Sequence, residues 1–62
     1  MNKLQIKAIH KEISFLEDNM YRYKMAEART PGSKTGNGVP FKQIIEEHQR
    51  DIALLKEGLP ES

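Results

Sequence analysis

The sequence predicts an all-α fold, an antiparallel two-helix hairpin that dimerises into a four-helix bundle. Two stretches carry apolar residues at alternating spacings of three and four, and a glycine-rich stretch of turn-forming residues separates them. A chain of 62 residues allows one domain at most. We therefore expect residues 1–62 to form a single helical-hairpin domain, with helices near residues 3–29 and 40–57 and a flexible loop over 30–39.

The first helix is predicted by a narrow apolar stripe at heptad spacing, made of Ile6, Ile9, Ile13, Leu16, Met20 and Tyr23. Asn2, with Gln5 three residues later, fits a capping box, so the helix should begin near residue 3. Pro31 disfavours the α conformation in the residue before it, so the helix should end by Arg29 or Thr30.

The second helix should begin at Pro40, because proline suits the first helical position. Gly58 and Pro60 should end it near residue 57. Its stripe again has heptad spacing, with a histidine in one core position: Phe41, Ile45, His48, Ile52, Leu55 and Leu59.

Antiparallel pairing of the helix ends fixes an expected register across the seam. It sets Ile13 near Leu55, Leu16 near Ile52, and Met20 or Tyr23 near His48. A histidine on an apolar seam is usually neutral with one hydrogen bond, and we expect Tyr23 to be its partner.

Composition excludes several classes of function. There is no cysteine for a disulfide or thiolate zinc site, and the two histidines lie on different helix surfaces. Ser14 has no histidine and acid arranged around it, so nucleophilic catalysis has no support. We expect no enzymatic activity, cofactor or metal. The net charge is +1, no apolar run could span a membrane, and the first residues lack a signal-peptide core; we expect a cytoplasmic location.

A second apolar surface is predicted away from the seam. Phe15 and Leu54 are rotated from the seam in the same sense and lie at the same level of the hairpin. We call this surface the Phe15–Leu54 face; it comprises Ala8, Phe15, Ala26, Ile44 and Leu54. It suits a protein partner or a second subunit, although scattered exposed apolar residues are also normal.

Basic residues gather at the loop end of the hairpin: Arg22, Lys24, Arg29, Lys34 and Lys42. With Tyr21 and Tyr23 beside them, they suit phosphate contact and base stacking. Lys3, Lys7 and Lys11 form a further stripe, interpreted as a solvated face or a contact for an acidic partner. The leading interpretation is a non-enzymatic protein-binding regulator, adaptor or inhibitor. The alternative is a nucleic-acid-binding protein that uses the basic loop end.

The stretch Glu47-His48-Gln49-Arg50-Asp51 lies on the expected second helix. The hairpin outline resembles the small sporulation phosphatases that act on response regulators, whose second helix carries an S-x-x-x-D signature. Glu47 stands where that signature has serine, so the resemblance covers the shape alone. A cryptic phosphatase-like enzyme is the third interpretation, after the protein-binding and nucleic-acid-binding ones.

Overall fold

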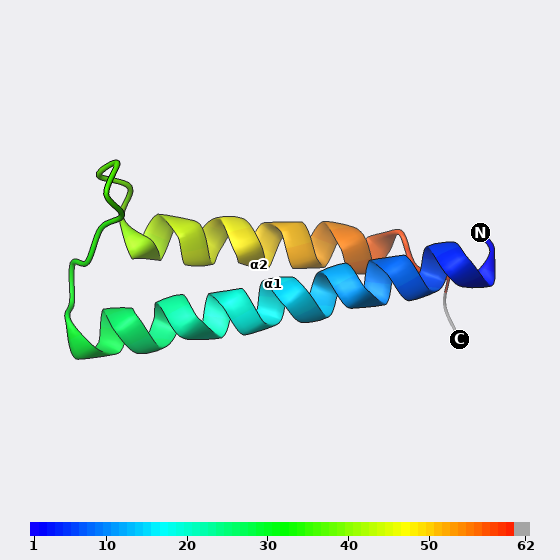
Figure 1. Cartoon of the computed structure of the whole chain (residues 1–62). Helices are drawn as coiled ribbons and strands as arrows, with labels where there is room; N and C mark the ends of the chain where they lie inside the picture. Colours follow the sequence, from blue (N-terminus) through cyan, green and yellow to red (C-terminus); the bar gives the residue numbers. More distant parts are fainter. Residues whose placement is uncertain (61–62) are drawn as a thin grey trace.

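Two helices of unequal length lie side by side and run in opposite directions (Figure 1). The computed structural model describes residues 1–60, in which α1 spans Lys3–Arg29 and α2 spans Phe41–Glu57. No strand forms within these residues, and one isolated antiparallel bridge joins Lys34 to Pro40. The all-α prediction and the two packed helices are confirmed.

The capping box predicted at the start of α1 is present. The Asn2 side chain accepts a hydrogen bond from the backbone N–H of Gln5 at 2.8 Å, and the Gln5 side chain accepts one from the Asn2 N–H at 2.9 Å. Two backbone donors that the helix cannot satisfy are thereby satisfied. At the other end, Thr30 leaves the α conformation directly before Pro31, as expected for a residue that precedes proline.

The start of α2 lies one residue later than the sequence suggested. Pro40 has φ −61° and ψ 140°, an extended conformation, so it caps the helix from outside. Its side chain cannot accept a hydrogen bond, and the backbone N–H of Phe41 instead donates to the Ser33 carbonyl at 2.9 Å. The carbonyl of Ser33 in the loop therefore satisfies a backbone N–H at the start of α2, as the side chain of an N-cap residue otherwise does.

The loop between the helices is held by backbone hydrogen bonds. The Thr35 N–H donates to the Val39 carbonyl and the Gly38 N–H donates to the Thr35 carbonyl, both at 2.9 Å. Gly32 and Gly38 both have φ of +84°, a conformation that residues with a Cβ rarely adopt. Two of the glycines that were expected to make the loop flexible thus also allow its turns to form, because they adopt positive φ angles.

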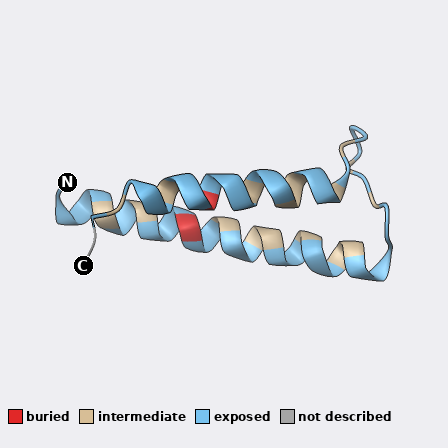
Figure 2. Cartoon of the chain, turned by 180° about the vertical axis from the view of Figure 1, so that it is seen from behind, coloured by how far each residue is buried: buried red, intermediate tan, exposed pale blue. Residues whose placement is uncertain are grey.

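The core of the hairpin is a single seam between the two helices. Ile13 and Ile52 are 6% and 7% exposed, and they are the two buried residues of the described chain, one from each helix (Figure 2). The other positions that heptad spacing assigned to the seam are half-buried: Ile6, Ile9, Leu16, Met20, Tyr23, Phe41, Ile45, His48, Leu55 and Leu59. The predicted stripes are therefore the ones that face each other.

Neither α1 nor α2 has the combination of length and apolar content that crossing a membrane requires.

Truncating the buried centre of the seam should destabilise the hairpin. We expect Ile13→Ala or Ile52→Ala to lower the free energy of unfolding by about 2–5 kcal/mol, because each leaves a cavity between the helices. Leu4→Ala is a matched control, since Leu4 is 78% exposed; its effect should stay within about 0.5 kcal/mol. Urea denaturation followed by circular dichroism measures all three, and equal effects at Leu4 and Ile13 would contradict this core.

Candidate protein-binding face

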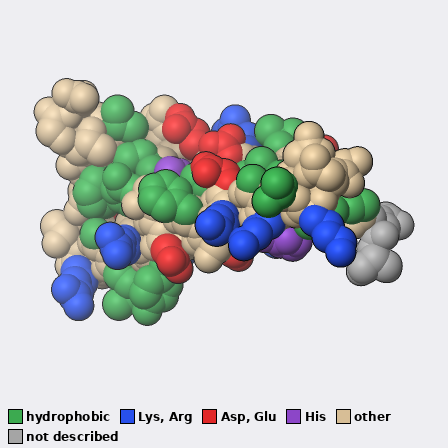
Figure 3. All heavy atoms as spheres, turned by 45° about the vertical axis from the view of Figure 1, so that its right-hand side comes forward, with side chains coloured by type: hydrophobic (Ala, Val, Ile, Leu, Met, Phe, Trp, Pro, Cys, Tyr) green, Lys and Arg blue, Asp and Glu red, His purple; other side chains and the backbone are tan. Residues whose placement is uncertain are grey.

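Residues 1–60 enclose no pocket and bring together no group of three or more side chains that could hold a metal ion. Apolar side chains lie at the surface among basic and acidic ones in the view of Figure 3.

Phe15, in the middle of α1, and Leu54, in the last turn of α2, are large apolar residues that are mostly exposed. Phe15 is 63% exposed and Leu54 is 64% exposed. Each lies about 130–140° around its helix from the seam, in the same sense, by the 100° step of an α-helix. In an antiparallel pair, equal rotations bring residues to the same side of the hairpin, so both side chains contribute to one face.

The remaining predicted members of the Phe15–Leu54 face contribute unequally. Ala8 is exposed, whereas Ala26 and Ile44 are half-buried. Ile44 precedes the seam residue Ile45, so its side chain lies between the face and the seam. Ala26 and Ile44 therefore lie at the boundary of the face, and Phe15 and Leu54 supply most of its exposed apolar area.

A polar link crosses the seam beside this face. The Asn19 side-chain amide donates to His48 Nε2 at 3.0 Å, and His48 Nδ1 donates to the Ile44 carbonyl at 2.9 Å. The expectation that His48 would bond Tyr23 is therefore wrong. Asn19 lies three residues after Leu16, on the flank of the stripe, and this position next to the seam is the signal that could have revealed it.

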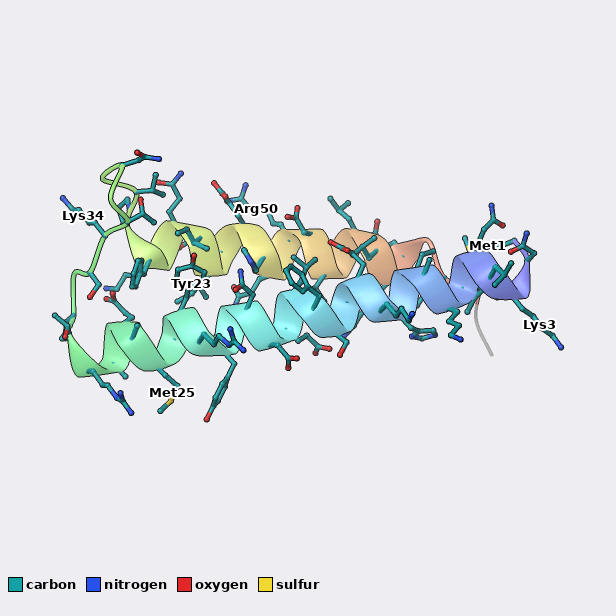
Figure 4. All side chains as sticks on the ribbon, viewed as in Figure 1. Met1, Lys3, Tyr23, Met25, Lys34 and Arg50 are labelled. Carbon is teal, nitrogen blue, oxygen red and sulfur yellow. The ribbon has the colours of Figure 1, made fainter. Side chains whose placement is uncertain are left out.

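Tyr23 has an aromatic environment rather than a hydrogen bond to His48. Its ring packs edge-on against Phe41 at a centroid distance of 4.9 Å and against His48 at 6.2 Å. Figure 4 shows Tyr23 directed from α1 toward α2. The predicted proximity of Tyr23 to His48 is confirmed, and the three rings close the seam near the loop.

The five basic residues predicted at the loop end are all exposed but do not form one patch. Arg22 and Arg29 are seven residues apart and share one side of α1, whereas Lys24 lies about 200° around the helix from Arg22. Lys34 lies beside the start of α2, away from the side of α1 that carries Met25 (Figure 4). Lys42 belongs to the first turn of α2.

Further exposed apolar residues lie on α1 outside the predicted face. Tyr21 is 64% exposed and Met25 is 41% exposed, and Met25 points away from α2 (Figure 4). Tyr21 was predicted to lie beside the basic residues of the loop end, whereas no role was predicted for Met25. Neither residue lies on the seam stripe or on the Phe15–Leu54 face, so the spacing of apolar residues in the sequence could not reveal a shared surface for them.

Comparison of the chain with protein-family models, curated proteins and solved structures finds no match.

The two hydrogen bonds of His48 require one tautomer. Nδ1 must carry the proton to donate to Ile44, and Nε2 must be unprotonated to accept from Asn19. We expect long-range nitrogen–proton NMR spectra at mildly alkaline pH to show the Nδ1–H form of His48, with exposed His10 as an internal reference. A predominant Nε2–H form would contradict both bonds, because Nδ1 could then not donate to the Ile44 carbonyl and Nε2 could not accept from the amide of Asn19.

Proposed function

We propose that this chain is a non-enzymatic protein-binding module that acts as a small regulator, adaptor or inhibitor. Docking uses the Phe15–Leu54 face. The observation that carries the proposal is the exposure of Phe15 and Leu54, more than 60% each, on one side of a molecule with only two buried residues in its described part. Large aromatic and aliphatic side chains that are exposed together are typical of surfaces that bind protein.

The accessible surface supports the need for a partner. The chain exposes 5007 Å², whereas a compact monomer of its 7.1 kDa mass would expose about 4,100 Å². The elongated shape thus leaves about 900 Å² more surface exposed than a compact fold of the same mass would. The radius of gyration, 13.9 Å against about 10.6 Å for a compact domain of this length, reflects the same elongated shape.

The partner we propose first is a second copy of the chain. Two hairpins joined through their Phe15–Leu54 faces around a two-fold axis would form a four-helix bundle with a closed core. Such a dimer requires no residues beyond those already exposed. A target protein that offers one or two helices could occupy the same face.

Nucleic-acid binding through the basic loop end has less support. Arg22 and Arg29 share one side of α1, but Lys24, Lys34 and Lys42 lie on another side of α1, in the loop and on α2, so the five cations do not form one patch. The two functions differ in salt dependence, since phosphate contacts weaken steeply with salt and apolar docking does not.

Sedimentation equilibrium at micromolar concentration tests the dimer. We expect a species of twice the 7.1 kDa monomer mass, and Phe15→Glu with Leu54→Lys should convert it to a monomer of lower stability. The introduced carboxylate and ammonium would have to be desolvated in the bundle, and the cost of desolvating two such charges can exceed the attraction between them.

Tyr21→Glu with Met25→Lys is the matched control, because it charges two exposed apolar residues outside the face. This variant should remain dimeric. A wild-type monomer would remove the homodimer and leave the face for a different protein. A dimer that survives the Phe15 and Leu54 substitutions would place the contact elsewhere, such as the first turns around Leu4 and Ala8.

A further inference from the structure

A row of basic residues runs along the side of α1 that faces away from α2. Lys3, Lys7, Lys11, Arg22 and Arg29 are all exposed, and they fall within a sector of about 100° opposite the seam. We call these five residues the outer row. Figure 4 shows Lys3 and Met25 both directed away from α2, near opposite ends of α1.

The outer row is long and rigid. From Lys3 to Arg29 the rise of an α-helix gives about 39 Å, comparable with the longest dimension of the molecule, 41 Å. α1 contains no glycine or proline, so it holds the five cations at fixed positions along one line. A ligand for this row must itself be extended and anionic.

The charge on this side of α1 is strongly one-sided despite the small net charge of the chain. Asp18 is the one acidic residue of α1 in the sector of the outer row; Glu12 and Glu17 lie on the flanks, and Glu27 turns toward the loop, where it accepts a hydrogen bond from the Gly32 N–H at 3.1 Å. α2 carries four acidic and three basic residues. The positive potential is thus concentrated on one surface.

The spacing of the charges along the row is uneven. Lys3, Lys7 and Lys11 follow one another at about 6 Å along the axis, and Arg22 comes about 17 Å after Lys11. Asp18 lies within this gap. The row therefore consists of two basic groups with an acidic residue between them.

We propose that the outer row binds the sugar–phosphate backbone of duplex nucleic acid, without reading its sequence. The two basic groups contact the two strands across a major groove, which is about 12 Å wide; flexible lysine and arginine side chains span the remainder. Asp18 then faces the open groove rather than a phosphate. A flat anionic membrane has no such gap and would meet Asp18 with repulsion.

Fluorescence anisotropy of the full chain with a labelled DNA duplex of mixed sequence, about 20 base pairs long, tests the proposal. If all five cations contact phosphates, the logarithm of the binding constant should fall with the logarithm of salt concentration with a slope of about −4.5 per chain. Raising salt from 50 to 200 mM would then weaken binding about 500-fold. A slope near zero, or no binding at the lower salt concentration, overturns the proposal.

Charge reversal locates the contact. Lys7→Glu with Lys11→Glu and Arg22→Glu should abolish binding, whereas Lys42→Glu with Arg50→Glu and Lys56→Glu, which changes the net charge of the chain equally, should retain most of it. Equal loss in both variants would mean attraction by net charge alone and overturns the outer row as the site. Circular dichroism checks that both variants remain helical.

A gain of affinity cannot be explained by misfolding, so Asp18→Asn provides an independent test. This substitution should tighten duplex binding several-fold, while Glu46→Gln on α2, also exposed, should leave it unchanged. Vesicles containing phosphatidylserine form the comparison arm. Binding to vesicles without binding to the duplex would assign the row to a membrane and overturn the proposal.

Discussion

Each helix of a two-helix hairpin can bury only the stripe that faces the other, because two cylinders touch along one line. Here that line is centred on Ile13 and Ile52, and the aromatic contacts of Tyr23 extend it toward the loop. About half of the unfolded surface is buried, below the roughly 60% typical of a domain this small. Side chains outside the line stay exposed, so the same constraint that makes the core thin also leaves Phe15, Leu54 and the basic side of α1 open to partners.

The Asn19–His48 link shows how this thin seam gains specificity. Apolar stripes at heptad spacing can slide past each other by a turn at modest cost, whereas a hydrogen bond between two particular side chains exists in one alignment only. His48 is further held by its bond to the Ile44 carbonyl, which fixes the ring relative to its own helix. Asn19 therefore helps define how α1 lies along α2, and it does so beside the face proposed for docking.

Elements governed by local rules could be predicted from the sequence, and elements governed by tertiary contacts could not. The bounds of α1 follow from the Asn2–Gln5 capping box and from Pro31, and the seam follows from residue spacing. Tyr23 lies beside His48 as predicted, but the partner of His48 was mispredicted because Asn19 lies on the flank of the apolar stripe, where heptad spacing assigns no contact. The hydrogen bond that caps the start of α2 was not predicted. Its acceptor is the backbone carbonyl of Ser33, which the fold of the loop brings to Phe41, and a backbone carbonyl leaves no sign in the residue types. The candidate face was predicted from the angular positions of its residues around each helix. The half-burial of Ala26 and Ile44 could be seen only once the two helices were packed together.

The closed loop has a consequence for how this hairpin could be enlarged. Gly36 and Asn37 lie in the turn that the Gly38 N–H closes on Thr35, both are exposed, and no seam contact involves them. A folded insert with its two ends close together would leave the Thr35 to Val39 hydrogen bond and the helix pair able to form. The entropic cost of lengthening such a loop grows slowly, by about 0.6 kcal/mol for each doubling. The turn is thus a natural point of attachment at which the hairpin could carry a second domain, held away from both the Phe15–Leu54 face and the outer row of α1.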